Sequence, residues 1–298
     1  MSSQTDPPPA SPPPTPLDTL LHGLFDDASL FPPASLAMPD AVAGYVRHHG
    51  AWYQAMTGAF VCPEARIGDL RISLTAANVA EIDLSLVVAG GAQAIDSAVE
   101  SVATEPRLRL RAVEVPVRRG TDPLPAVAEV VDALDRTLLA GAAGYVEVPV
   151  AALSSDVLDA VAARGYRPKL RTGGVTAAAF PDEATLAAAL YAVTDLRVPF
   201  KCTAGLHHAI RHAAGDTGFE HHGFLNVLLA VVAALRGGDP GDVAAVLGDH
   251  DAEDVAARVA SIEPDEAAMV RSLFTSFGTC STDEPVADLA ALGLADGP

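Results

Sequence analysis

Arg167-Pro-Lys-Leu-Arg-Thr-Gly-Gly174 and Val198-Pro-Phe-Lys-Cys-Thr-Ala-Gly205 are two short, similar stretches of the chain. They predict strands over residues 168–172 and 199–203, each ended by a glycine turn. Between them, the alanine- and leucine-rich stretch 182–193 predicts an amphipathic helix. A strand, a helix and a second strand in this order predict a parallel sheet.

The same alternation recurs along most of the chain. Six further strands are predicted, over residues 24–29, 59–63, 82–88, 108–115, 144–148 and 273–279. Helices are predicted between them, for example over residues 40–53, 92–102, 124–139, 155–164 and 284–292. Eight such units fit one (β/α)8 TIM barrel, which we place over residues 17–298. The alternative is a doubly wound open sheet, which would usually carry a GxGxxG turn after its first strand, and none occurs here.

Two segments stand outside this regular pattern. Residues 1–16 are rich in Pro, Ser and Thr, and they predict a disordered tail rather than a signal peptide. The connection between the seventh and eighth strands, residues 205–272, predicts a histidine-rich loop, a buried apolar helix over 225–235 and two further helical stretches. A helical insertion of this length is long enough to cover the mouth of the barrel.

Composition narrows the possible partners. The chain has 298 residues and a formal charge of −19, which argues against nucleic acid or an anionic membrane as a partner. The longest apolar run is too short to span a bilayer. Cys62, Cys202 and Cys280 are odd in number and far apart, so neither a disulfide framework nor a four-thiolate zinc site is expected. A reduced, cytoplasmic setting fits best, and a homo-oligomer is compatible with these features.

Lysine usage is the most unusual feature of the composition. Lys169 and Lys201 are the only lysines, and the other 17 of the 19 basic residues are arginine (19 minus 2). Arginine stays charged under almost all conditions, whereas a desolvated lysine can lose its proton and act as a nucleophile or base. The two retained amines therefore favour chemistry that arginine cannot perform, and biased composition is the alternative explanation.

Side-chain alternation along the strands predicts which residues point into the barrel. One charged and polar set shares the interior face near the carboxyl ends of the strands, where barrel enzymes hold their active sites. An unpaired charge there is costly, so five charges must pair with each other or with a ligand: Glu114, Glu147, Lys169, Arg171 and Lys201. A purely structural ion network is the alternative. The interior set is Asp83, Ser85, Glu114, Tyr145, Glu147, Lys169, Arg171, Lys201 and Thr203.

The lysines have a predicted electrostatic consequence. Two ammonium groups on adjacent strands, with Arg171 beside them, disfavour each other's charged form, and desolvation acts in the same direction. We therefore expect the pKa of one lysine to lie well below its ordinary value. Such a lysine is a candidate Schiff-base nucleophile or general base. Lys169 is favoured because Arg171 shares its strand face, and Glu147 or Glu114 can then carry protons.

Three glycine turns follow the last three strands and predict an anion pocket. Backbone N–H groups and hydroxyls at strand ends bind phosphate or carboxylate well. The hydroxyls after the eighth strand can instead start a helix. Together these features indicate a small anionic substrate. The candidate substrate-binding residues are Arg171, Thr172, Gly173, Gly174, Thr203, Gly205, Asn226, Ser276, Gly278 and Ser281.

Histidines form the other candidate group. His207 and His208 directly follow the seventh strand, so they are candidates for acid–base catalysis or substrate hydrogen bonding. His208 and His212 are four residues apart, a spacing that metal sites on helices use. We expect no cofactor. The alternative is a divalent metal held by His208 and His212, with Asp26 from the end of the first strand as the carboxylate ligand.

Five motifs resemble a bacterial family of uncharacterised proteins. The resemblance covers most of the chain, but it implies no particular activity. The motifs are Leu30-Phe-Pro-Pro-Ala34, Lys169-Leu-Arg-Thr-Gly-Gly174, Phe200-Lys-Cys-Thr-Ala-Gly-Leu-His-His208, Gly223-Phe-Leu-Asn226 and Ser276-Phe-Gly-Thr-Cys-Ser281.

Two of these motifs also resemble the sixth- and seventh-strand lysine motifs of deoxyribose-phosphate aldolase and its class I aldolase relatives. The resemblance implies that Lys169 forms the Schiff base, that Lys201 tunes it, and that the turn at Gly205 holds phosphate. The match covers only a few residues. The Lys-x-Ser-Thr-Gly-Phe and Lys-Ala-Ser-Gly-Gly patterns of those relatives are not met in this sequence. Leu206-His-His208 also departs from the glycine turn of those relatives.

These observations predict an enzyme that acts on a small anionic carbonyl compound. We expect an aldolase-like carbon–carbon lyase or an isomerase that uses an active-site lysine. One alternative is a metal-dependent hydrolase or lyase that uses His207, His208 and His212. Another is a non-catalytic binding or scaffolding barrel.

Overall fold

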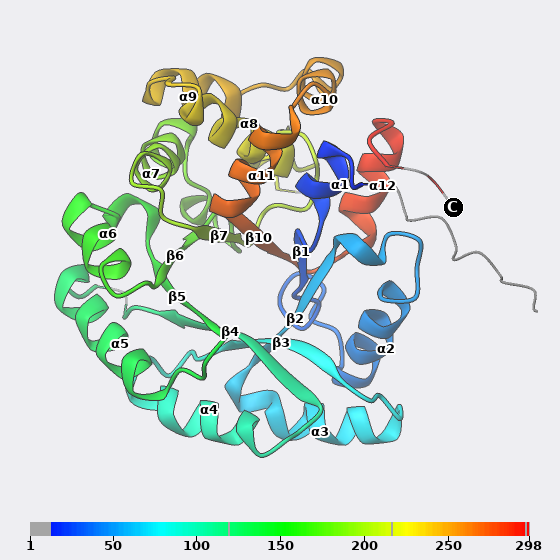
Figure 1. The fold of residues 1–298 in the computed structure, drawn as a ribbon, viewed down its shortest axis with the longest axis vertical. Coiled ribbons are helices and arrows are strands. Elements are labelled where there is room, and N and C mark those ends of the chain that lie inside the picture. Colours follow the sequence, from blue (N-terminus) through cyan, green and yellow to red (C-terminus); the bar gives the residue numbers. More distant parts are fainter. Residues whose placement is uncertain (1–12, 119, 216, 296, 298) are drawn as a thin grey trace, which may run out of the picture.

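The computed structural model describes residues 13–118, 120–215, 217–295 and 297. Its centre is a closed barrel of parallel strands, ordered β1-β10-β7-β6-β5-β4-β3-β2 (Figure 1). The predicted (β/α)8 barrel is confirmed. The strands are β1 (Phe25–Asp27), β2 (Thr57–Pro63), β3 (Ile82–Val87), β4 (Leu108–Pro116), β5 (Ala143–Val148), β6 (Arg167–Arg171), β7 (Phe200–Thr203) and β10 (Phe274–Thr279).

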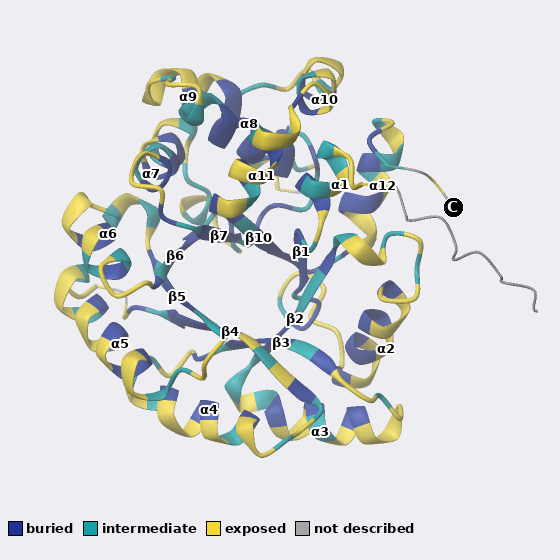
Figure 2. Ribbon diagram, in the orientation of Figure 1, coloured by how far each residue is buried: buried dark blue, intermediate teal, exposed yellow. Residues whose placement is uncertain are grey.

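Helices surround the barrel, and their inner faces are buried while their outer faces are exposed (Figure 2). Short polar side chains start several of them: Asp122, Ser154 and Asp182 each accept a hydrogen bond from a backbone N–H in the first turn. These helices are α2 (Met38–His48), α3 (Ile67–Ala76), α4 (Ile95–Ala103), α5 (Pro123–Thr137), α6 (Ser155–Ala162), α7 (Glu183–Asp195) and α12 (Asp283–Ala291).

A short helix, α1 (Pro16–Leu21), precedes the first strand. Thr15 caps it by accepting from the Asp18 N–H, and the Asp18 side chain accepts in turn from the Thr15 backbone. The predicted tail over residues 1–16 therefore extends too far, because Thr15 and Pro16 belong to the start of α1. Residues 1–12 of that tail lie outside the described residues.

The predicted helical insertion between the seventh and eighth strands of the barrel is confirmed, with one helix more than expected. It holds a two-stranded ladder and four helices: β8 (His212–Ala213), β9 (Glu220–His221), α8 (Phe224–Leu235), α9 (Pro240–Leu247), α10 (Ala252–Ala260) and α11 (Pro264–Leu273).

The four helices of the insertion lie beside the barrel wall rather than over its mouth (Figure 1). Phe224 at the start of α8 contacts the outward-facing rings of Phe25 and Phe277. Its ring centre lies 5.6 Å from that of Phe25 and 5.2 Å from that of Phe277. The insertion is long enough to cover the mouth, but its helices do not lie over it, because Phe224 packs on the outer face of β1 and β10. Within the described residues, no helix has the length and apolarity needed to cross a bilayer.

The predicted alternation of side chains holds in β6 and β7. Leu170, Phe200 and Cys202 are fully buried in the apolar layer under the helices. Lys169 and Lys201 point the other way, into the barrel, and stand directly opposite each other in the ladder. The strand register therefore brings the two amines to one level of the barrel interior.

The turns after β6 and β7 pack against each other through their backbones. A Cβ atom on Gly173 would lie 2.6 Å from the Cα atom and 2.9 Å from the N atom of Gly205. Gly205 has a φ of +78° and follows Ala204, which has a φ of +62°. Only glycine allows both the close approach and the left-handed backbone of Gly205 at low cost. This contact fixes the ends of the two lysine-bearing strands relative to each other.

We predict that Gly173→Ala destabilises the protein by about 1–3 kcal/mol, because the added methyl group must displace backbone rather than a flexible side chain. Gly68→Ala is the matched control: its Cβ would meet no atom within 4 Å, and it lies in α3. The control variant should be neutral or slightly stabilising. Urea unfolding of both variants measures the difference, and equal stabilities would contradict the packing role of Gly173.

Candidate active site

Glu114 on β4 stands at the centre of the barrel interior. Its Oε1 atom lies 2.6 Å from Lys201 Nζ and accepts a hydrogen bond of 2.5 Å from Ser85 Oγ. Its Oε2 atom lies 2.7 Å from Lys169 Nζ. The side chain of Glu114 is only 2 % exposed. One carboxylate therefore bridges both lysines in a site that is almost closed to water.

Lys201 is held from a second side by Asp26 on β1. Lys201 Nζ donates to Asp26 Oδ2 at 2.6 Å, and the same oxygen accepts from Ser276 Oγ at 2.6 Å. Asp26 Oδ1 accepts from the backbone N–H of Ala59 at 2.8 Å. The Lys201 ammonium also lies 5.4 Å from the ring centre of Tyr145, within cation–π range. Lys201 is thus enclosed by fixed partners.

Lys169 is held from its other side by Glu147 on β5. Lys169 Nζ lies 2.9 Å from Glu147 Oε2, and Glu147 Oε1 accepts from Arg171 Nε at 2.7 Å. The exposed fraction of the side chain rises from 4 % at Lys169 to 11 % at Glu147 and 34 % at Arg171. The network therefore reaches solvent through Arg171.

The network balances three cations, Lys169, Arg171 and Lys201, against three carboxylates, Asp26, Glu114 and Glu147. These six residues are called the interior ion network below. Each lysine lies between two carboxylates, and the carboxylates separate the two ammonium groups. The order of charges is therefore alternating, which is the arrangement that best offsets the desolvation of buried ions.

Because of this alternation, the lysine pKa values shift upward, opposite to the predicted shift. Burial alone would lower the pKa of Lys169, but the charges of Glu114 and Glu147 outweigh it and hold the pKa above its ordinary value. The pKa of Lys201 is raised in the same way by Asp26 and Glu114. Burial likewise opposes the charged form of Glu114, but the two lysines hold its pKa well below the usual range. The expectation of a lysine with a lowered pKa is wrong, because the sequence did not reveal how many carboxylates reach each amine.

The predicted catalytic group is only partly assembled. The structure brings Lys169, Lys201, Glu114, Glu147 and Arg171 together and adds Asp26, Ser276 and Ser85. Of the predicted metal ligands, His208 and His212 lie close together, but Asp26 does not join them because it is bound to Lys201. Within the described residues, no three His, Cys, Asp or Glu side chains already stand at metal-binding spacing.

The residues predicted to bind an anion have mixed roles. The Thr172 side chain is buried and donates to the carbonyl oxygen of Ala204 at 2.5 Å, so it links the turns after β6 and β7. Thr203 and Gly278 are paired across β7 and β10. A Cβ atom on Gly174 would lie 2.7 Å from that of Ala179, which indicates close packing.

Two of the predicted anion-binding residues serve the fold. Asn226 is fully buried, accepts from the Arg211 N–H at 2.9 Å, and donates to the carbonyl oxygens of Val246 and Asp249. The prediction that Asn226 binds substrate is therefore wrong, because all of its donors and its acceptor are used by backbone. Ser281 Oγ accepts from the Glu284 N–H at 3.3 Å, so it supports the start of α12.

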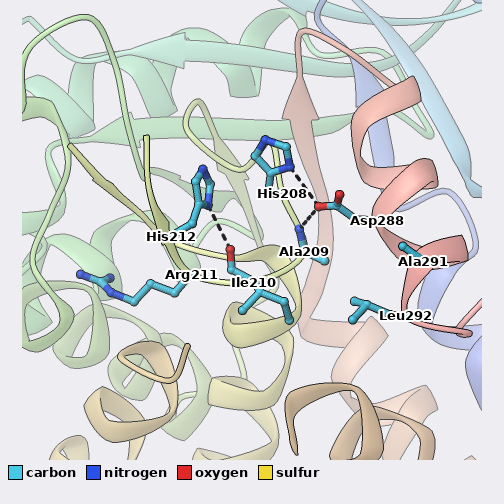
Figure 3. A pocket seen from close by; sticks show the side chains of 8 residues that line it. All are labelled: His208, Ala209, Ile210, Arg211, His212, Asp288, Ala291 and Leu292. Atoms are coloured by element: carbon cyan, nitrogen blue, oxygen red, sulfur yellow. Dashed lines mark hydrogen bonds and ion pairs between the residues drawn. The ribbon is translucent and has the colours of Figure 1, made fainter. Parts of the chain in front are cut away.

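The histidines form a second group, apart from the lysines. His207 Nδ1 lies 3.2 Å from Glu284 Oε2. His208 Nδ1 lies 3.0 Å from Asp288 Oδ2, a contact that Figure 3 shows. Burial lowers the pKa of His207 below its usual value. We had not predicted the two carboxylates. Their i,i+4 spacing on the helix after the last strand was the available signal, because it places both on one helix face.

The cysteines show no sign of nucleophilic function. Cys62, Cys202 and Cys280 are free and buried. Burial raises the pKa of all three thiols, to about 12 for Cys62. They therefore stay protonated near neutral pH and act as small apolar side chains.

Comparison with known proteins gives no function for this site, so its interpretation depends on the geometry described above. No protein-family model matches the chain, and no curated protein matches it. The resemblance to the lysine motifs of class I aldolases therefore stays a prediction.

We predict that Glu114→Gln lowers the free energy of unfolding by about 3–5 kcal/mol, because it removes the charge that bridges the two lysines. Glu100→Gln on the exposed face of α4 is the control and should change stability by less than about 0.5 kcal/mol. Guanidinium unfolding measures both variants. A Glu114→Gln variant as stable as the control would show that the network contributes little to stability.

The same variant gives a pH prediction. Glu114 and Glu147 have lowered pKa values in the folded protein, so their contribution is fully present above the ordinary pKa of 4.5 and is lost as pH falls through the folded values. The lysines have raised values, so their contribution is present below pH 10.5 and is lost only above it. Below pH 4.5, the unfolding free energy of the parent protein should therefore fall more steeply than that of Glu114→Gln, by up to about 1.4 kcal/mol per pH unit. Parallel pH dependences in urea unfolding would contradict the assignment.

Proposed function

We propose that the protein is an enzyme that forms a Schiff base between Lys169 and the carbonyl carbon of a small anionic compound. The reaction that follows is an aldolase-like carbon–carbon cleavage or an isomerisation. The (β/α)8 barrel is a fold that commonly carries enzymes, with active sites at the carboxyl ends of the strands. The observation that carries the proposal is that Glu147 bridges Lys169 to the exposed end of the interior ion network at Arg171.

Arg171 supplies the site for the anionic group. Its guanidinium is one-third exposed, so it can form a paired hydrogen bond to a carboxylate or phosphate that enters from the mouth. Thr203 lies opposite Arg171 in the adjacent strand and offers a hydroxyl at the same level. A substrate held there has its carbonyl group on the side of Lys169, the next interior residue along β6.

Anion binding also activates the lysine. At rest Lys169 is protonated, and Arg171 helps to keep Glu147 ionised. When the substrate anion draws Arg171 away, Glu147 becomes more basic and takes a proton from the Lys169 ammonium. The free amine then attacks the carbonyl carbon to give a carbinolamine. The proton on Glu147 leaves with the hydroxyl group as water, which yields the protonated Schiff base and restores the carboxylate.

Lys201 has a supporting role in this scheme. Its ammonium is enclosed by Asp26 and Glu114, and its pKa is raised, so it stays charged throughout. Lys201 also pairs with Glu114, the carboxylate that pairs with Lys169. This second pairing weakens the hold of Glu114 on the Lys169 proton. It is a positioning residue for the reacting amine rather than a nucleophile.

A non-catalytic binding barrel is the second candidate. The balance of three cations and three carboxylates favours it, because a neutral network needs no ligand to compensate a buried charge. The two candidates differ in one property that can be measured: only the enzyme exposes a lysine to covalent capture.

We predict that sodium borohydride, added together with a panel of 2-oxo acids and phosphorylated aldehydes and ketones, traps a covalent adduct on Lys169. The chain has only two lysines, so peptide mass spectrometry assigns the adduct without ambiguity. Arg171→Gln should reduce trapping by at least about tenfold, because a charged hydrogen bond to the anion is lost.

Lys169→Arg is the decisive variant, because arginine keeps the charge but cannot form a Schiff base. It should abolish trapping, whereas Lys201→Arg should leave trapping at Lys169 detectable in any protein that folds. Absence of an adduct with every compound of the panel, or an adduct on Lys201 alone, would overturn the assignment of Lys169. Absence of any adduct would support the binding barrel.

A further inference from the structure

A cluster of histidines lies on the loop after β7, outside the interior ion network. The ring centres of His208 and His212 are 4.6 Å apart, and those of His212 and His221 are 5.2 Å apart. His212 and His221 stand directly opposite each other in the β8–β9 ladder. His207 is next to them, with its ring centre 6.3 Å from that of His221. Residues from 207 to 221 thus bring four imidazoles into one cluster.

Hydrogen bonds fix the tautomer of two of these rings. His208 Nδ1 bonds to Asp288 Oδ2 at 3.0 Å, and His212 Nδ1 bonds to the carbonyl oxygen of Ile210 at 3.1 Å. Carboxylate and carbonyl oxygens only accept, so Nδ1 carries the hydrogen in both rings. The Nε2 atoms of His208 and His212 are therefore bare acceptors when the rings are neutral. Figure 3 shows both rings extending to the same side of the loop, away from these partners.

His221 adds a third acceptor that lacks a partner. Its Nδ1 atom is buried, and the described residues offer it no hydrogen bond. A buried polar atom without a partner is rare in folded proteins and calls for a bound water or ion. The described residues thus leave the Nδ1 atom of His221 without a donor, in a cluster with two rings whose Nε2 atoms can accept.

We propose that His208, His212 and His221 bind one divalent transition-metal ion. A cation satisfies all three lone pairs at once, which no neutral donor does. An ion bonded to imidazole nitrogens at about 2.0–2.1 Å holds the ring centres about 5 Å apart, close to the two spacings seen here. The rings do not yet stand at metal-binding spacing, so ligation requires them to turn about their side-chain bonds.

The surroundings have the features of a metal site beyond the ligands. The Asp288 carboxylate holds His208 by its far nitrogen, and the backbone N–H of Ala209 fixes the carboxylate at 2.8 Å. Such carboxylate–histidine pairs orient the imidazoles of metal centres and make them more basic. An open depression of about 340 Å³ is lined by His208, His212 and Asp288, so two of the three proposed ligands border a space that solvent reaches (Figure 3).

The donor set selects the class of ion. Imidazole nitrogen suits Zn²⁺, Cu²⁺, Ni²⁺ and Fe²⁺, whereas Mg²⁺ and Ca²⁺ prefer oxygen ligands. Three histidines leave a fourth position of a tetrahedral ion open for water or a ligand, as in catalytic zinc sites. An anion is the poorer fit, because it needs protonated rings, and two imidazolium ions with centres 4.6 Å apart repel each other.

Metal binding to the untagged full-length protein tests the proposal without any measurement of activity. Zn²⁺ is titrated at pH 7.5 in competition with a chromophoric chelator, and Co²⁺ is added separately to record its visible d–d absorption. We expect one tightly bound Zn²⁺ per chain and the strong visible bands of four-coordinate Co²⁺.

His212→Ala and His221→Ala should each weaken Zn²⁺ binding by more than about 100-fold, and Asp288→Asn, which keeps all three ligands, by about 10–100-fold. His22→Ala is the matched control, because His22 is exposed and lies before β1. It should bind as the parent does. If His212→Ala melts at a lower temperature without metal, His212→Gln replaces it, since glutamine keeps most of the volume.

The proposal is overturned if the parent protein binds no Zn²⁺, or if the ligand variants bind as tightly as His22→Ala, which would show adventitious binding to surface histidines. It is also overturned if the Co²⁺ spectrum has only the weak bands of a six-coordinate ion. Because these measurements do not involve the lysines, their result is independent of the borohydride experiment.

Discussion

Charge neutrality inside the barrel is the constraint on which the rest of the structure depends. Moving a single ion from water into an apolar interior costs many kcal/mol, and only close partners of opposite charge offset that cost. The barrel solves this by alternation: Asp26, Lys201, Glu114, Lys169, Glu147 and Arg171 follow one another so that each charge touches only opposite charges. The chain of ion pairs runs from β1 through the centre to the mouth, and it ties five of the eight strands together.

In the proposed mechanism, this order gives the two lysines different functions. Lys201 lies between Asp26 and Glu114, and both carboxylates are buried, so its direct partners are shielded from a ligand at the mouth. Lys169 has the same number of partners, but one of them, Glu147, shares its charge with an arginine that solvent reaches. A ligand that competes for Arg171 alters the field on Glu147 and hence on Lys169. In the proposed mechanism, Lys169 is therefore the reactive amine because its partners lead to solvent, and not because the two amines differ chemically.

The sequence was sufficient for the architecture and for five of the six members of the network, but not for Asp26 or for the pairing of the charges. The alternation of side chains along the strands at 167–171 and 200–203 placed Lys169 and Lys201 inside the barrel. The face to which a strand residue points depends only on local backbone geometry. The direction of the lysine pKa was wrong because it depends on contacts between non-adjacent strands: Asp26 lies 175 residues from Lys201. Asn226 was misassigned for a similar reason. A polar residue in this motif predicted a contact with substrate. The fold instead pairs the Asn226 amide with the backbone of Arg211, Val246 and Asp249.

The interior ion network and the histidine cluster both depend on the position of β7, because Lys201 lies on this strand and the histidine loop follows it. Lys201 is bonded on two sides and fixes the middle of β7, and the close contact of Gly205 with Gly173 fixes its end. The histidines begin two residues later, so the loop that carries them starts from an anchored point. Its other partners, Glu284 and Asp288, lie on α12, which follows β10, the neighbour of β7 in the barrel. Adjacent strands thus deliver imidazoles and carboxylates to the same place, because parallel strands end at one rim. The same geometry that gathers the lysines inside the barrel gathers the histidines at its edge.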